Sequence, residues 1–146
     1  MFKVQATRLF FIVLSLLALA ACQSTPSTPD DPLIGTYWKL MSIGGQPVTV
    51  AEGQREPYMV LQRHEQSVHG HSGCNALSGH YSQHHNRLQF SRIVSTRMFC
   101  ADAMATEKAF VDLLQREVEP RIDGNRLTLM DDNGEALARF ESRLMQ

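Results

Sequence analysis

Residues 102–118, with the sequence DAMATEKAFVDLLQREV, interrupt a chain that otherwise consists of short β-like runs. The segment contains no Gly or Pro, and its apolar residues recur at the three- and four-residue spacing of one helical face: Ala103, Met104, Phe110, Val111, Leu114 and Val118. Asp102 is suited to cap the first turn, and Pro120 is suited to end the helix. The pattern predicts one amphipathic helix over residues 102–118.

The sequence on both sides of this helix is typical of β-strands separated by turns. Strand-like runs lie at residues 36–41, 57–62, 67–72, 79–83, 87–90, 126–130 and 136–140. Residues 84–86 are expected to form a turn, and Asn133-Gly134 is a strong hairpin signal. The order of elements predicts a mainly β member of the α+β class. We expect a small curled antiparallel sheet or partial β-barrel with one packed amphipathic helix.

Length and composition limit the classes of protein that fit. The chain has 146 residues, of which 43% are hydrophobic and 20% are charged, and its formal net charge is −1. These values suit one small domain, and they exclude a large multidomain enzyme and a disordered chain. The charge gives no electrostatic reason to expect a nucleic-acid partner.

The N-terminus has the organisation of a secretory signal. Lys3 and Arg8 precede the apolar run at residues 9–19, which is too short for a comfortable transmembrane helix. The ending Leu19-Ala20-Ala21-Cys22 resembles the bacterial lipobox, which implies cleavage before Cys22 and acylation of that residue. An ordinary signal followed by an unrelated cysteine is the alternative. Gln23 is not the Asp that commonly retains lipoproteins in the inner membrane, so the resemblance favours the outer membrane, facing the periplasm.

The remaining chain divides into a tether and a domain. Residues 23–32, QSTPSTPDDP, contain three prolines and no large apolar residue, so we expect a flexible or extended tether that reaches at most roughly 33 Å. The predicted organisation is a signal peptide at 1–21, a lipidated Cys22 with its tether at 22–32, and a folded domain at 33–146.

Three sequence elements in the domain resemble a known family. They are the opening Gly35-Thr36-Tyr37-Trp38-Lys39-Leu40, the central stretch SGCNALSGHY at residues 72–81, and STRMFC at residues 95–100, with Glu107 one turn into the helix. In this order and spacing they resemble the META domain family, which includes the heat-shock-inducible HslJ-type lipoproteins of bacteria. The motif positions carried by the resemblance are Gly35, Thr36, Trp38, Leu40, Gly73, Asn75, Gly79, Tyr81, Thr96 and Met98.

The resemblance covers about residues 33–142 and implies a small β-barrel-like fold with a packed helix. It implies a connection with envelope stress and antibiotic tolerance, and it brings no general enzymatic activity or cofactor. Within the motif, the glycines indicate tight turns or close backbone approach. Asn75 is expected to hydrogen-bond backbone in a turn.

Cys74 and Cys100 are the two thiols that remain after Cys22 is lipidated. In an oxidising compartment they are expected to form a disulfide, worth about 3.5 kcal/mol in the chain-entropy model. The alternative is a redox pair, although the CxxC spacing of thioredoxin-like sites is absent.

Glu107 falls on the apolar face of the predicted helix, where a carboxylate is costly unless it is paired. Arg97 lies shortly before the helix and is expected to form a structural ion pair with it. The alternative assigns Glu107 to general acid–base catalysis, although the motif fixes no second carboxylate or nucleophile nearby.

All six histidines lie within residues 64–85. His69 and His71 would share one face of a strand, and His80 could add a third imidazole to a zinc site. The spacing matches no dense zinc signature, so solvated strands and turns are the alternative, and we predict no metal or cofactor.

The sequence leaves more than one function open. The first interpretation is a non-enzymatic lipoprotein, anchored in the membrane by its lipid, that binds an envelope protein or a small apolar ligand at the concave surface or the mouth of its partial barrel. The second is an inhibitor of a hydrolase such as lysozyme or a protease, because disulfide-braced loops bind without an ordering cost. The third is a periplasmic zinc-binding protein that uses the His64–His85 cluster.

Overall fold

The computed structural model describes residues 33–143. The predicted signal peptide, Cys22 and the tether lie outside the described residues, as do the last three residues of the chain. Within the described part, no helix has the length and apolar character needed to cross a membrane.

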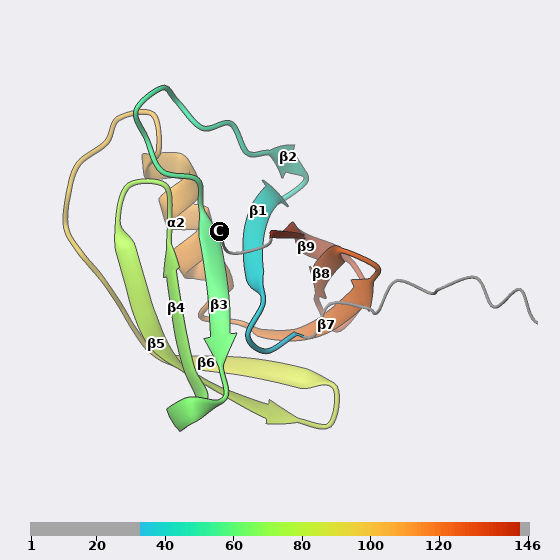
Figure 1. Cartoon of the computed structure of the whole chain (residues 1–146). Coiled ribbons are helices and arrows are strands. Elements are labelled where there is room, and N and C mark those ends of the chain that lie inside the picture. The colour runs from blue at the N-terminus through green and yellow to red at the C-terminus, as the bar shows by residue number, and fades with distance from the viewer. Residues whose placement is uncertain (1–32, 144–146) are drawn as a thin grey trace, which may run out of the picture.

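The described chain consists mainly of strands, with one α-helix inserted between the sixth and seventh (Figure 1). The elements are β1 (Tyr37–Ile43), β2 (Gln46–Pro47), β3 (Tyr58–Gln62), the 3-10 turn η2 (His64–Gln66), β4 (Ser67–His71), β5 (Ala76–His84), β6 (Arg87–Ser95), α2 (Met104–Leu113), β7 (Glu117–Asp123), β8 (Arg126–Met130) and β9 (Ala136–Arg143). The predicted strands all fall within or beside these strands, whereas β2 and β7 were not predicted.

All strands belong to one antiparallel sheet that curls back on itself. The strand order is β2-β1-β3-β4-β5-β6-β7-β8-β9, and β1 also pairs with β9. The β1–β3 pairing consists only of Trp38 with Met59 and Lys39 with Tyr58. The β6–β7 pairing is equally short, so the curled sheet does not close a regular barrel. The predicted fold class is therefore confirmed.

The helix is shorter than the sequence predicted. It spans Met104–Leu113, and its N-cap residue is Ala103, without a side-chain cap, so Asp102 does not cap it. Val118 and Pro120 belong to β7, where they are buried at alternate positions. The prediction was wrong because Val118 satisfies the helical spacing and the two-residue period equally well. Pro120 fits the strand because the pairing with β6 ends at Val118, so its missing N–H interrupts no ladder on that side.

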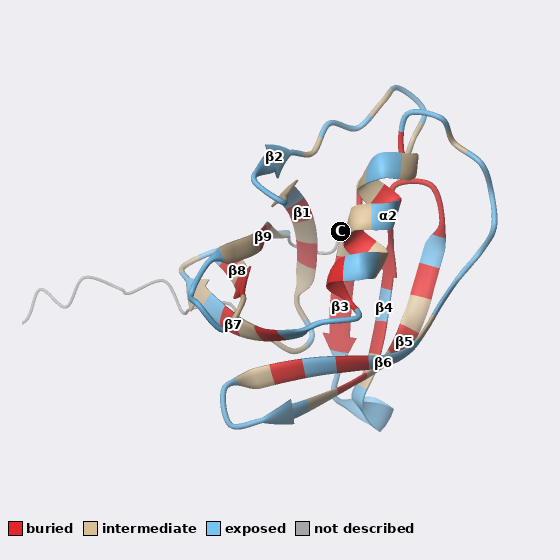
Figure 2. Ribbon diagram, turned by 180° about the vertical axis from the view of Figure 1, so that it is seen from behind, coloured by how far each residue is buried: buried red, intermediate tan, exposed pale blue. Residues whose placement is uncertain are grey.

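The interior of the curled sheet is filled by apolar side chains. Trp38, Phe110 and Phe140 are buried, and the rings of Phe110 and Phe140 lie 6.0 Å apart between centroids. The helix carries the buried residues Glu107, Phe110 and Leu113, and Figure 2 shows it on the same side of the curled sheet as the buried parts of the strands. The indole N–H of Trp38 donates to the Leu33 carbonyl at 3.1 Å, which attaches the start of the domain to this core. The interior of the curled sheet is thus a packed apolar core.

Two predicted local features are explained by the backbone. The hairpin at Asn133-Gly134 joins β8 to β9, and Asp131 closes it by accepting the backbone N–H groups of Asn133 and Glu135 at 2.9 Å each. Motif residue Gly79 lies where the β5–β6 register shifts. A Cβ at this position would lie 2.6 Å from Ile93 Cδ1 and 2.9 Å from the Ser91 carbonyl, so only glycine fits the bulge.

Candidate functional site

The motif residues 72–75 form a buried turn between β4 and β5. Gly73 has a φ of +104°, which favours glycine. The backbone N–H of Ser72 donates to the Asn75 carbonyl at 2.8 Å, and the backbone N–H of Asn75 donates to Ser72 Oγ at 3.0 Å. Gly73 N–H donates to His71 Nδ1 at 3.1 Å. This turn therefore holds the Asn75 side chain in a fixed direction.

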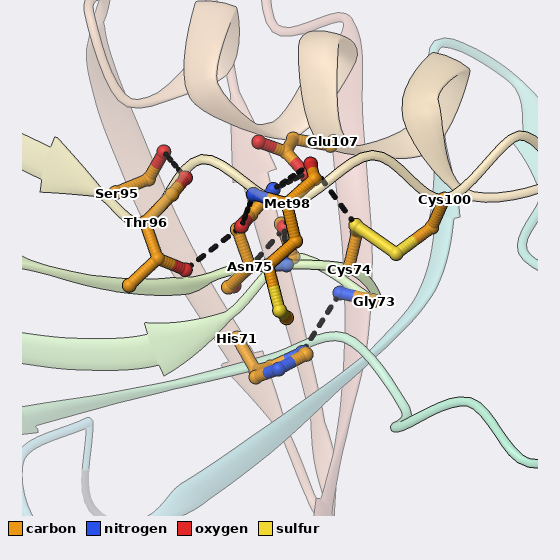
Figure 3. Close-up of a disulfide and its surroundings, with 10 residues drawn as sticks. His71, Gly73, Cys74, Asn75, Ser95, Thr96, Met98, Cys100 and Glu107 are labelled. Carbon is orange, nitrogen blue, oxygen red and sulfur yellow. Dashed lines mark hydrogen bonds between the residues drawn. A yellow bond between two sulfur atoms is a disulfide. The ribbon is translucent and has the colours of Figure 1, made fainter.

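The side-chain amide of Asn75 joins three parts of the chain (Figure 3). Its Nδ2 donates to the Met98 carbonyl at 3.0 Å and to Glu107 Oε2 at 2.7 Å. Its Oδ1 accepts the Thr96 hydroxyl at 2.8 Å and the Met98 backbone N–H at 2.7 Å. Both donors and both acceptor positions of the amide are used. We call this arrangement, with Ser72, the Asn75 hub; it confirms that Asn75 bonds backbone and extends its role to a side chain on α2.

Glu107 is buried on α2 and takes its hydrogen bonds from neutral groups. Besides Asn75 Nδ2, the Ser72 hydroxyl donates to Oε2 at 3.1 Å. The predicted ion pair with Arg97 is wrong: Arg97 is exposed, and the described ion pairs include neither residue. The reason is that the motif turn already supplies donors at the carboxylate, so burial of Glu107 needs no cation.

Cys74 and Cys100 form the disulfide that the sequence predicted. The S–S distance is 2.09 Å and the Cα atoms are 5.7 Å apart. Cys74 Sγ lies 3.4 Å from the Met98 carbonyl, a contact without a proton to share because the sulfur is in the disulfide. The disulfide and the hub together fix residues 96–100, which we call the hub loop, at both ends.

The hub loop displays apolar side chains to solvent. Phe99 is 81% exposed and Met98 is 57% exposed, and Val94 at the end of β6 is 62% exposed. A large apolar side chain that is held in water by a fixed backbone suits contact with a partner.

A groove lies beside the hub loop on the outer face of the sheet. Its volume is about 420 Å³, and it is lined by Tyr58, His69, Gly70, Ala76, Leu77, Ser78, Val94, Ser95 and Thr96. Tyr58 also lines a second hollow of about 230 Å³, together with Tyr37, Arg55 and Glu56. We call the two together the Tyr58 groove. Sequence analysis missed it because the apolar run at residues 58–62 does not alternate and so does not show which face of the strand is packed.

Side chains around the hollow form an ordered cluster. The rings of Tyr37 and Tyr58 stack with centroids 4.3 Å apart. Glu56 accepts the Tyr37 hydroxyl at 3.1 Å and pairs with Lys39 at 2.6 Å. The hydrogen bond from Lys39 lowers the pKa of Glu56, whereas burial and the bond to Glu56 raise the pKa of Tyr37. The phenol therefore stays protonated and the carboxylate stays charged near neutral pH.

The three histidines proposed for zinc do not form a ligand group. His69 is exposed and His71 is buried on β4, and His80 lies on β5 with its Nδ1 buried and unpartnered within the described residues. His71 Nδ1 accepts the Gly73 N–H, and burial, with a smaller effect of Arg55, lowers the pKa of this imidazole. Across residues 33–143, no group of three or more His, Cys, Asp or Glu side chains could hold a metal ion.

The remaining motif residues have structural positions. Trp38 and Leu40 are core residues of β1, and Tyr81 is buried on β5 with its hydroxyl donating to the Gln62 carbonyl at 3.2 Å. Gly35 has a φ of +88° in the segment before β1, and Thr36 follows it.

The fold and the hub define a class: a small curled antiparallel sheet with one inward-packed helix and a disulfide-fixed loop. The META domain model matches residues 31–144, and the chain belongs to this family. A solved structure of a protein from Burkholderia xenovorans is similar, with a TM-score of 0.61 and 22% identity over 86% of this chain and 97% of that one. A second solved structure has a TM-score of 0.58 and 21% identity over 73% of this chain and 87% of that one. At these identities the two structures show the fold alone. No curated protein matches the chain significantly.

Proposed function

We propose that this protein is a non-enzymatic binding module, anchored by a lipid on Cys22 to the outer membrane and facing the periplasm. The lipobox-like ending of the signal and the Pro-rich tether support the anchor. The Cys74–Cys100 disulfide agrees with an oxidising compartment. Membership of the META family supports a role in envelope stress or antibiotic tolerance.

The observation that carries the binding role is the exposure of Phe99 on the hub loop. Three hydrogen bonds to the Asn75 side chain and the disulfide hold this loop, yet Phe99 is 81% exposed. A partner that binds a preformed loop has no ordering cost to overcome, and the apolar ring gains free energy when it leaves water.

The position at which the tether joins the domain supports a partner on the side away from the membrane. Ile34 bridges to Leu61, and Gly35 N–H donates to the Leu61 carbonyl at 2.7 Å, so the domain begins near one end of β3. The opposite end of β3 begins at Tyr58, which pairs with His71 beside the hub. A tether that reaches the domain at Leu33 therefore joins it at the end of β3 opposite the hub, which leaves the hub loop free to face away from the membrane. The occupant we propose is a periplasmic protein with an apolar pocket for Phe99.

The non-enzymatic part of the proposal is supported by how the motif's polar groups are used. The Ser72 hydroxyl is fully buried and donates to Glu107, and the Asn75 amide has no free hydrogen-bonding position. These groups are occupied in holding the loop and the helix together, so they offer no nucleophile or base to a substrate.

The test is site-specific crosslinking in intact cells, with a photoreactive side chain at position 99. The control is the same side chain at exposed Arg139 on β9. We expect one adduct from position 99 that position 139 does not give. The partner identified in this adduct should then bind purified Phe99→Ser at least tenfold more weakly than the unaltered protein. Equal adducts at both positions, no adduct, or unchanged affinity of Phe99→Ser would overturn the proposal.

Lipidation is tested separately with Cys22→Ser. This variant should accumulate as a longer precursor without acyl chains. Normal processing and acyl labelling of Cys22→Ser would show that the anchor is assigned wrongly.

A hydrolase inhibitor is a second candidate, favoured by the same disulfide-braced loop with its projecting Phe99. Inhibition of lysozyme or of a protease by the purified protein, lost in Phe99→Ser, would identify this as the form that binding takes.

A further inference from the structure

The Tyr58 groove lies on the face of the sheet that points away from the core. Tyr58, His69 and Ser78 come from neighbouring strands, with His69 paired directly with Ser78. Residues next to them in sequence, Met59 and Val68, are buried in the core. The groove therefore lies across the consecutive strands β3, β4 and β5 and the end of β6, on a base that the core holds rigid.

The long part of the groove has an uncharged, hydroxyl-rich lining. Tyr58, Ser78, Ser95 and Thr96 contribute hydroxyl groups, and His69 contributes an imidazole ring. Val94 supplies an apolar wall that is 62% exposed. Hydroxyl groups beside an aromatic ring and an aliphatic wall match a ligand with its own hydroxyl and amide groups and apolar C–H faces.

The hollow at the Tyr37 end adds a positive charge. Its acid, Glu56, is already satisfied by Lys39 and by the Tyr37 hydroxyl. Arg55 lines the same hollow, is exposed, and takes part in none of the ion pairs of the described residues. The Arg55 guanidinium is thus a positive charge in the hollow that the described ion pairs do not neutralise, and it complements a carboxylate.

We propose that the Tyr58 groove binds a sugar that carries a carboxylate. The ring and its hydroxyl or acetamido groups lie along Tyr58 and Ser78, and the carboxylate meets Arg55. This site is separate from Phe99 and does not depend on the protein partner proposed above.

The pairing of the strands favours a sugar over a peptide. β4, at the floor of the groove, pairs with β3 and with β5 through five residue pairs on each side. An extended peptide gains affinity by adding a strand at a free sheet edge, and β4 offers no free edge at this floor. A ligand that lies on β4 is therefore recognised by side chains, which suits hydroxyl-bearing rings.

The proposal is tested by ligand-detected saturation-transfer NMR on the full mature protein with its anchor in detergent micelles. N-acetylmuramic acid is compared with N-acetylglucosamine, which has the same ring without the lactyl carboxylate. Glucuronic acid is compared with glucose. The first pair represents cell-wall sugar and the second represents acidic polysaccharide. The pair whose acid binds more tightly identifies the source of the ligand.

We expect at least one acid to bind at least tenfold more tightly than its neutral partner. Arg55→Gln should reduce this preference to less than twofold, and added salt should weaken it. The matched control Arg63→Gln changes an exposed arginine at the other end of β3 and should leave the preference intact. His69→Ala, at an exposed position, should lower the affinity for the acid and for its neutral partner by the same factor.

Several outcomes would overturn the proposal. They are no binding by either acid, equal binding of acid and neutral sugar, or a preference that survives Arg55→Gln in a variant with an unchanged melting curve. Tighter binding of an acidic peptide than of either acid sugar, lost in Arg55→Gln, would assign the groove to peptides instead.

Discussion

The regions around Glu107 and Glu56 hold a carboxylate in different ways. Glu107 is buried on α2, and its charge is stabilised by an amide N–H of Asn75 and the hydroxyl of Ser72. Glu56 is partly exposed, with a side chain 35% accessible, and it pairs with Lys39 and a phenol. Neutral donors that belong to one rigid turn can replace a cation in the interior, whereas at the surface a lysine serves because water still solvates both charges.

The comparison predicts that the largest loss of stability comes from breaking the hub at Asn75. Asn75→Ala leaves the Glu107 carboxylate with fewer donors and removes the partners of both Met98 backbone groups. We expect the free energy of unfolding to fall by about 4 kcal/mol. Urea denaturation at neutral pH with the disulfide intact measures this loss.

The control is Asn86→Ala in the β5–β6 turn, where the side chain makes an exposed hydrogen bond to Glu119 and should cost less than about 1 kcal/mol. The double variant Asn75→Ala/Glu107→Ala should lose less than the sum of its single changes, because the unpaired charge is then absent. Equal effects of Asn75→Ala and Asn86→Ala would contradict the hub.

The disulfide should contribute nearly as much. Replacing Cys74 and Cys100 together by Ala removes the cross-link between the hub turn and the hub loop. The expected loss is about 3.5 kcal/mol in the chain-entropy model. The unaltered protein, unfolded in urea after its disulfide has been reduced, should have a denaturation midpoint similar to that of the double alanine variant. A loss below about 1 kcal/mol would show that the hub alone orders the loop.

The sequence was sufficient to predict most of the fold. The strand-like runs at residues 57–62 and 126–130 and the Asn133-Gly134 turn are local signals, and the structure confirms them. The end of the helix was not predictable because Val118 fits both periods. The two-residue strand β2 has too few positions to show any alternation.

The site was only partly predictable for a related reason. The disulfide and the turn-forming role of Asn75 follow from residue type and from the resemblance. The partners of Glu107 do not follow in this way. They depend on how β4 and β5 place the loop at residues 72–75 beside the start of α2, a contact between residues 32 positions apart in sequence. Proximity in sequence favoured Arg97 as the partner of Glu107, but in the structure the Asn75 amide points at the carboxylate and donates to it. The groove at Tyr58 likewise depends on which strand faces are packed.

The Glu56 region should respond weakly and in a pH-dependent way. Glu56→Gln removes an exposed ion pair, so the expected loss near neutral pH is about 0.5–1 kcal/mol. The hydrogen bond from Lys39 lowers the pKa of Glu56 in the fold. The stabilisation is therefore complete above the ordinary glutamate pKa and fades as the pH falls through the lowered value. Unfolding curves of both proteins should differ at pH 7 and converge in acid. If the difference in free energy of unfolding between the two proteins widened on acidification, the Glu56–Lys39 pairing would be refuted.

Arg97→Ala should give the smallest effect, and this result separates the two explanations of Glu107. If neutral donors hold the carboxylate, loss of the exposed arginine changes the free energy of unfolding by no more than about 0.5 kcal/mol. If an Arg97–Glu107 ion pair existed, the same change would leave a buried unpaired charge and cost about 3–5 kcal/mol. The measurement compares Arg97→Ala, Glu107→Ala and the double variant by urea denaturation with the disulfide intact. Additive effects with a small contribution from Arg97 would confirm that Asn75 and Ser72 suffice. Strong coupling between the two changes would instead support an ion pair between Arg97 and Glu107.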